Sequence, residues 1–165
     1  MKFAFTFCLY FVFRIYSFAQ EPDTSRYIVM PYNTPEAFYN QKMLPATLNN
    51  DDIKLIFKLL KKCMSDYNKE TLDSKYYKET MAEHPDLNRS IFFIDTNYSH
   101  CLQIVPATNV NGCKTAWVNC FCGNKIAEDD RKFIVQVADG GPCFFSFYVD
   151  FKNQEYYSLR VEGYE

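Results

Sequence analysis

The stretch "WVNCFCG" (residues 117–123) places Cys120 and Cys122 one residue apart in a run of strand-forming residues. Such a pair suits three kinds of chemistry: a disulfide scaffold, a metal centre with thiolate ligands, or a redox-active dithiol. Side chains two residues apart on a strand are separated by roughly 6.5 Å, which is beyond the reach of a disulfide. Each of the two cysteines must therefore find another partner or stay reduced.

A metal site at this stretch would draw its ligands from His100, Cys101, Cys120 and Cys122. Thiolate and imidazole are suitable ligands for zinc or copper. The spacing matches no closed-site pattern such as paired C-x-x-C motifs, and His100 and Cys101 alternate to opposite faces of a strand. We therefore expect no metal and no other cofactor, with His100 at the surface or on an edge strand and the cysteines oxidised or buried.

Catalytic motifs give no support for an enzyme. A thiol oxidoreductase usually carries C-x-x-C at a helix N-terminus, whereas this C-x-C lies in an expected strand. The sequence has neither G-x-S-x-G nor H-E-x-x-H, and its two histidines are His84 and His100. Glu128, Asp129 and Asp130 lie in a polar stretch that is typical of a solvated loop. A non-enzymatic role is the better interpretation.

The first 19 residues have the features of a secretory signal peptide. Lys2 precedes an apolar run at residues 3–12, and "SFA" at residues 17–19 suits cleavage after small residues. The run before Arg14 is shorter than the ~20 residues that a membrane anchor needs. We expect residues 1–19 to be removed and the chain to be secreted or periplasmic.

Six cysteines remain after that cleavage, and an even number in an oxidising compartment favours disulfides. The disulfide candidates are Cys63, Cys101, Cys113, Cys120, Cys122 and Cys143. Loss of the cations Lys2 and Arg14 changes the net charge from −2 to −4. A mildly acidic chain has no electrostatic reason to bind nucleic acid or an anionic membrane, so we expect neither as a partner.

The rest of the chain divides into an extended lead at residues 20–47 and a single α+β domain at residues 48–165. The lead carries four prolines and one short strand candidate, "RYIVMPY" at residues 26–32. Asn49 is a good N-cap for a helix whose apolar residues recur at three- and four-residue spacing. That stripe consists of Ile53, Ile56, Phe57, Leu60, Met64 and Tyr67. A second short helix is expected before Pro85.

The second half of the chain is rich in Phe, Tyr, Val and Ile and is broken by turn signals. We expect strands near residues 91–94, 98–107, 113–122, 131–138, 143–151 and 155–161. Short connections favour antiparallel neighbours. The expected fold is therefore α+β, with one amphipathic helix packed on an antiparallel β-meander of about five strands, a layout similar to that of cystatins.

Hairpin register gives an expectation for the cysteines. A tight turn at "NG" (residues 111–112) would pair Cys101 with Cys122 and Gln103 with Cys120. Cys101–Cys122 is then the expected disulfide, because the two side chains share a face. In the last hairpin, a three-residue loop at residues 152–154 would place six apolar residues on one face: Phe145, Phe147, Val149, Tyr157, Leu159 and Val161.

Several motifs together resemble a family of small secreted bacterial proteins without an established role. They are "FAQ" at the end of the signal, "CMSDYN" at the helix end, "WVNCFC", "DGGPCFF" and the closing "YYSLRVEGYE". The resemblance covers roughly residues 48–165, and "NCFC" and "DGGPC" are its most specific parts. It implies a periplasmic or extracellular α+β domain, and it implies no catalytic residue.

Two functions from different classes follow. The first is a secreted non-enzymatic binding or structural domain, stabilised by disulfides, whose ligand is a protein, peptide or surface polymer. Tyrosine suits interfaces because it is apolar and also donates a hydrogen bond. The tyrosines considered are Tyr76, Tyr77, Tyr98, Tyr148, Tyr156, Tyr157 and Tyr164. A cystatin-like inhibitor is one version, although "QIVPA" (residues 103–107) resembles the inhibitor loop only loosely and lies in an expected strand.

The alternative is a metal-binding or thiol-active secreted protein built around the "CFC" strand. It requires Cys120 and Cys122 to be reduced and exposed together, and a disulfide at either residue would disfavour it.

Overall fold

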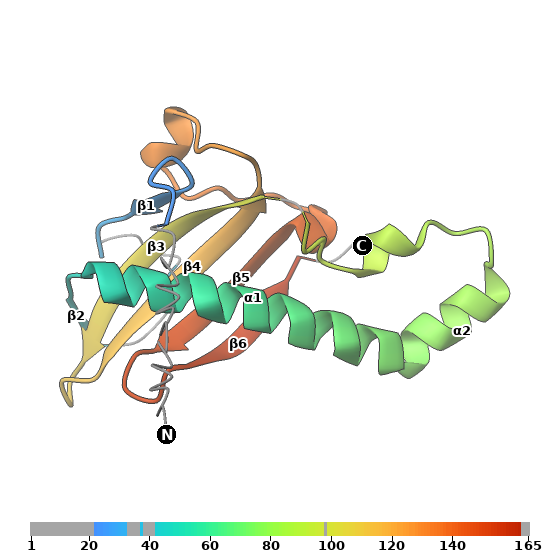
Figure 1. Cartoon of the computed structure of the whole chain (residues 1–165), viewed down its shortest axis with the longest axis horizontal. Helices are drawn as coiled ribbons and strands as arrows, with labels where there is room; N and C mark the ends of the chain where they lie inside the picture. The colour runs from blue at the N-terminus through green and yellow to red at the C-terminus, as the bar shows by residue number, and fades with distance from the viewer. Residues whose placement is uncertain (1–21, 33–36, 38–41, 98, 163–165) are drawn as a thin grey trace, which may run out of the picture.

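A long helix lies across one face of a six-stranded, mostly antiparallel sheet (Figure 1). The computed structural model describes residues 22–32, 37, 42–97 and 99–162. The expected signal peptide at residues 1–19 lies outside this part of the chain. The fold is α+β, as the sequence predicts.

The elements follow one another from the lead to the last hairpin. In chain order they are β1 (Tyr27–Val29), β2 (Met43–Pro45), α1 (Asn50–Asp73), α2 (Lys75–Glu83), β3 (His100–Asn109), β4 (Lys114–Cys122), β5 (Phe144–Asp150) and β6 (Glu155–Val161). Short 3-10 turns occupy residues 89–92, 129–131 and 141–143.

The strand order in the sheet is β1-β3-β4-β5-β6, and β2 pairs with the far end of β3. The pairs from β3 to β6 are antiparallel neighbours, as expected. The pair of β1 with β3 is parallel. This departure from a pure meander arises because α1 lies between the two strands in the chain and serves as the crossover that a parallel pair requires.

Helix α1 begins at a capping box. The Asn49 side chain accepts a hydrogen bond from Asp52 N at 2.9 Å, and the Asp52 carboxylate accepts one from Asn49 N at 2.8 Å. This arrangement satisfies two backbone donors that the first turn leaves without intrahelical partners. The N-cap prediction is confirmed. The helix ends at Asp73, and its C-cap residue Ser74 also caps the start of α2 through its side chain.

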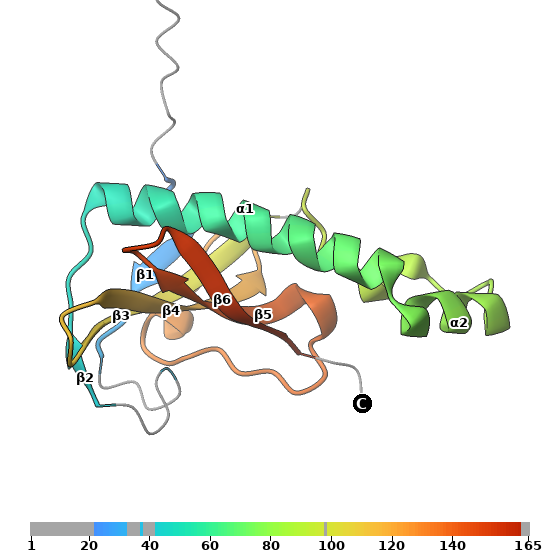
Figure 2. The same ribbon diagram turned by 90° about the horizontal axis from the view of Figure 1, so that it is seen from below.

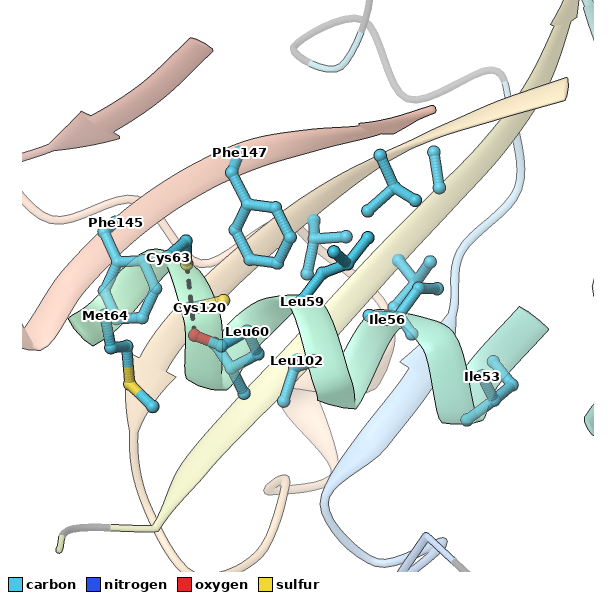
Figure 3. Close-up of a cluster of buried hydrophobic side chains, with 14 of the residues drawn as sticks. Ile53, Ile56, Leu59, Leu60, Cys63, Met64, Leu102, Cys120, Phe145 and Phe147 are labelled. Atoms are coloured by element: carbon cyan, nitrogen blue, oxygen red, sulfur yellow. Dashed lines mark hydrogen bonds between the residues drawn. The ribbon is translucent and has the colours of Figure 1, made fainter. Parts of the chain in front are cut away.

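The main core lies between α1 and the sheet (Figure 3). The buried side of α1 carries Ile53, Ile56, Leu59, Leu60, Cys63 and Met64. Facing it, the sheet contributes Leu102, Ile104, Ala116, Val118, Cys120, Phe145, Phe147 and Val149. Phe57 and Tyr67 of the expected stripe are partly buried at its margins. Because side chains alternate between the two faces along each strand, every second residue of the sheet lies on the face that packs against α1.

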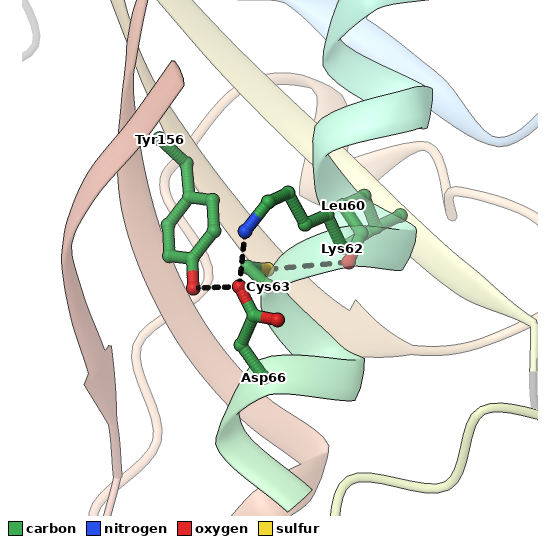
Figure 4. A network of polar contacts seen from close by, with 5 residues as sticks. All are labelled: Leu60, Lys62, Cys63, Asp66 and Tyr156. Atoms are coloured by element: carbon green, nitrogen blue, oxygen red, sulfur yellow. Dashed lines mark hydrogen bonds and ion pairs between the residues drawn. The ribbon is translucent and has the colours of Figure 1, made fainter. Parts of the chain in front are cut away.

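A polar contact ties α1 to the edge strand β6 (Figure 4). Asp66 Oδ2 accepts hydrogen bonds from Lys62 Nζ and, at 2.7 Å, from the Tyr156 hydroxyl. The Lys62 hydrogen bond, followed by that from Tyr156, lowers the pKa of Asp66. Burial and the carboxylate contact raise the pKa of Tyr156. The phenol thus stays protonated and keeps donating to Asp66.

The β3–β4 hairpin differs from the expected register by one residue. Cys101 lies opposite Phe121, and Gln103 lies opposite Asn119. The loop has three residues because Asn109 closes it: its side chain accepts from the backbone N of Asn111 and of Cys113. Gly112 then takes the left-handed conformation (φ 77°) that such a loop requires.

The β5–β6 hairpin confirms the expected pairing only at its far end. Phe145 faces Val161, as expected. Nearer the loop, Val149 faces Tyr156 rather than Tyr157. The shift arises at a bulge where Ser158 has a φ of 52°, so one extra residue of β6 is accommodated there.

Two expected strands are wrong. Residues 89–92 form a 3-10 turn in place of the strand expected at 91–94. Residues 131–138 cross the sheet face without joining a strand ladder. Strand propensity in both segments is local and is overridden by tertiary contacts, which for residues 131–138 are the hydrogen bonds of Gln103 and Asn119 to Phe133 and Val135.

The second short helix is confirmed as α2, whose Tyr77 packs edge-on against Phe92 and Phe93. Within the described ranges, no helix is both long and apolar enough to span a membrane.

Candidate functional site

Cys122 forms a disulfide with Cys143, across the end of the β4–β5 pair. The Cα atoms are 5.3 Å apart, and the pairing continues the register in which Phe121 faces Phe144. The expected bridge between Cys101 and Cys122 is therefore wrong. The one-residue register shift turns Cys101 to the opposite face of the sheet from Cys122.

The other four disulfide candidates are free thiols. Cys63, Cys101 and Cys120 are fully buried, and Cys113 is half-buried in the β3–β4 hairpin. Burial raises the pKa of Cys63 to about 12, and it raises the pKa of Cys101 and, more strongly, of Cys120. These buried thiols are apolar core residues, because the reactive species is the thiolate.

The four metal candidates do not come together. His100 is buried on β3, edge-on to Phe145 at 5.4 Å, so its expected surface or edge position is wrong. Cys101 points to the other face, and Cys122 is held in its disulfide. Among the described residues, no group of three or more His, Cys, Asp or Glu side chains could hold a metal ion.

The face of the sheet opposite α1 carries three rows of side chains that cross β4, β5 and β6. The first row is aromatic, with Trp117, Tyr148 and Tyr157. The second is polar, with Asn119, Ser146 and Arg160. The third begins with the aromatic pair Phe121 and Phe144 and reaches Glu162. A polar strip therefore runs between two aromatic strips.

The connection from β4 to β5 covers part of this face (Figure 2). Its anchor is Gln103, a fully buried side chain on β3. Gln103 Nε2 donates to the carbonyls of Asp130 and Phe133 at 2.6 and 2.7 Å, and its Oε1 accepts from Val135 N at 2.9 Å. Asn119 Nδ2 donates to Gln103 Oε1 and to Val135 O. Two side-chain amides thus hold the connection as a neighbouring strand would.

A groove of about 860 Å³ lies between that connection and the open face. Its floor is the polar row with Trp117, Phe144 and Tyr148 beside it, and its wall is residues 134–138. At the end of the wall, a Cβ at Gly140 would come within 2.2 Å of the Phe144 ring. The "DGG" turn thus serves backbone geometry, which lets the chain approach Phe144 closely.

The charges of the groove are balanced. Arg160 Nε lies 3.4 Å from a Glu162 carboxylate oxygen, and both side chains are accessible to solvent. The Asn119 amide nitrogen is used by the anchor, whereas Ser146 makes no hydrogen bond through its hydroxyl within the described part of the chain. The groove therefore offers polar hydrogen-bonding groups without a net charge.

The tyrosines considered in the sequence differ in exposure and in the contacts that they make. Tyr157 stacks on Tyr148 with ring centroids 5.3 Å apart and is 46% exposed. Tyr76 is exposed, and Tyr77 and Tyr156 hold structural contacts. Tyr98 and Tyr164 lie outside the described residues. The groove residues Asn119, Ser146 and Arg160 carry no sequence signal of their own, because only cross-strand register makes them a row.

Comparisons of the chain with protein-family models, curated proteins and solved structures gave no significant match. The resemblance that rests on "NCFC" and "DGGPC" stays a prediction.

Proposed function

We propose that the chain is a secreted, non-enzymatic binding domain and that the groove on the open face of its sheet is the binding surface. The observation that carries this proposal is the polar row of Asn119, Ser146 and Arg160, set between aromatic rows under an anchored connection. Concave sites with an apolar lining and a few oriented polar groups are typical of ligand binding. The ligand is a protein, peptide or surface polymer.

The disulfide supports a location outside the cytoplasm, because such bonds persist in oxidising compartments. The expected signal peptide agrees with this location. The alternative built on the "CFC" strand has no supporting observation, since Cys122 is bonded to Cys143 and Cys120 is fully buried. A thiolate or metal chemistry would need both sulfurs to be accessible.

Trp117 provides the test, because it is the sole tryptophan of the chain and it lines the groove. The probes are pooled random dodecapeptides and defined oligosaccharides of glucose, galactose and N-acetylglucosamine, each titrated against the full secreted chain. We expect a saturable change in Trp117 emission with at least one probe.

Arg160→Ala should weaken that binding, and Arg89→Ala, an exposed arginine of the 89–92 turn, should leave it unchanged. Absence of any saturable change, or equal effects of the two substitutions, would overturn the proposal.

A further inference from the structure

The wall of the groove is a strand-forming segment without a strand partner. Residues 133–138 read "FIVQVA", with β-branched and aromatic side chains that favour a strand. In the described structure they join no ladder. Local sequence preferences that conflict with the folded state are expected at functional sites.

Backbone hydrogen bonding within this segment is uneven. Val135 uses both its N–H and its C=O in the contacts with Gln103 and Asn119. The N–H groups of Gln136, Val137 and Ala138 donate no hydrogen bond to any described residue. Donors of this kind, next to a groove, are what a sheet edge presents to an incoming strand.

The segment is also exposed. Phe133 is 72% and Val137 37% exposed, although both are apolar. Exposed apolar residues beside unused backbone donors are a liability for pairing with other chains, which proteins normally blunt with charges or proline. Residues 133–138 carry neither.

We propose that the groove binds an extended polypeptide, which adds as a strand to residues 136–138 and lies over the polar row. This inference rests on the proposed function and names its ligand class. In the extended form, successive N–H groups point in opposite directions, so Gln136 N–H points away from the amides that hold Val135. Gln136 N–H then donates to the ligand backbone, and Ser146 and Arg160 contact it from the floor.

The groove fits a polypeptide better than a glycan or a polyanion. Sugars bind on open aromatic faces, but Trp117 is only 8% exposed and the Tyr148 ring is stacked against Tyr157. A polyanion would need surplus cations, whereas Arg160 is paired with Glu162. The backbone N–H groups of residues 136–138 remain as donors, and the carbonyl groups of an uncharged, extended polypeptide can accept their hydrogen bonds.

The test begins with selection of a random dodecapeptide phage library on the immobilised full chain. Enriched peptides are then synthesised with single N-methyl groups along the backbone. We expect N-methylation to weaken binding roughly tenfold at alternate positions and to be tolerated between them, because only every second N–H of an added strand faces its partner.

Two variants of the chain complete the design. Gln136→Pro removes the backbone donor and should weaken binding roughly tenfold relative to Gln136→Ala, which removes the same side chain and keeps the donor. Unchanged Trp117 emission and thermal midpoint show that both variants are folded. A peptide that binds without period-two sensitivity, or equal affinity of the two variants, would overturn the inference.

The outcomes also separate this inference from the proposed function. If an oligosaccharide binds in an Arg160-dependent way and the library yields no peptide, the strand inference fails and the binding domain stands. If neither class of probe binds, both fail.

Discussion

Cys120 and Cys122 differ in chemical state although a single residue separates them. Cys122 is in a disulfide at the end of β4, and Cys120 faces α1 in the core near Cys63 (Figure 3). Burial raises the pKa of Cys63 and of Cys120, so neither thiol forms a thiolate near neutral pH. The two cysteines of the C-x-C motif therefore have separate structural roles: Cys122 forms a cross-link, and Cys120 is part of the hydrophobic core.

Thiol labelling should distinguish the buried cysteines from the accessible one. With iodoacetamide at pH 8 and without reductant, we expect Cys113 to be labelled rapidly, because it is the half-buried free thiol of the described chain. Cys63, Cys101 and Cys120 should react only after unfolding. Peptide mapping identifies the sites, and native labelling of Cys120 at the rate of Cys113 would contradict this account.

Removal of the disulfide should reduce stability substantially. The bond closes a loop with a sequence separation of 21 residues, so paired Cys122→Ala and Cys143→Ala substitutions should cost about 3 kcal/mol of unfolding free energy. Denaturant unfolding measures the loss. Cys113→Ala is the matched control and should change the free energy little, and an equal loss in the control would argue against the bridge.

Tyr156→Phe should destabilise the chain in a pH-dependent way. At neutral pH the lost hydrogen bond to Asp66 should cost about 1 kcal/mol, with Tyr76→Phe as an exposed control. The folded pKa of Asp66 is lowered, so its contribution is complete above its unfolded pKa and is lost as pH falls through the folded value. The stability difference should therefore shrink below about pH 4, and a difference that persists unchanged would contradict the assignment.

Among the elements, the connection between β4 and β5 depends on one buried side chain. Gln103→Leu removes four hydrogen bonds and leaves the Val135 amide without its acceptor. We expect a loss of about 2 kcal/mol and faster hydrogen exchange at residues 131–135, with β3 and β4 unaffected. Thr108→Val, on the same strand, is the control. Unchanged exchange at residues 131–135 would show that the anchor lies elsewhere.

Elements with strong local signals could be predicted from the sequence. The cap at Asn49 and the stripe of α1 determine a helix without reference to the sheet. Register could not be predicted, because it depended on the Asn109 side chain, which lengthens one loop, and on a bulge at Ser158. An error of one residue reverses the face of every side chain, and it gave Cys101 the wrong partner.

The candidate site was beyond prediction for the same reason. Asn119, Ser146 and Arg160 become neighbours only when three strands are in correct register. Residues 131–138 were expected to be a strand because propensity cannot reveal that the side chains of Gln103 and Asn119 hold this segment against the sheet face. The failure of that expectation is informative, since it identifies the strand-forming wall of the groove.

In the molecule as a whole, the two faces of the sheet differ in how far they are covered. Helix α1 covers one face and forms the main core together with the side chains of that face. The other face is covered only in part, by the connection between β4 and β5 (Figure 2). The Gln103 and Asn119 amides hold this connection against the sheet. Substitutions in the groove should therefore change binding with little effect on stability, and substitutions beneath α1 should do the reverse.

Hydrogen exchange of the full chain, with and without the strongest binder from the peptide and oligosaccharide panel, locates the ligand on the surface of the protein. We predict protection at residues 134–138 and at residues 158–162, in the second half of β6 and just after it, where the groove lies. The outer side of α1 should be unchanged. Protection confined to α1 or to β1 and β2, or a panel from which nothing binds, would contradict the assignment of the groove as the binding site.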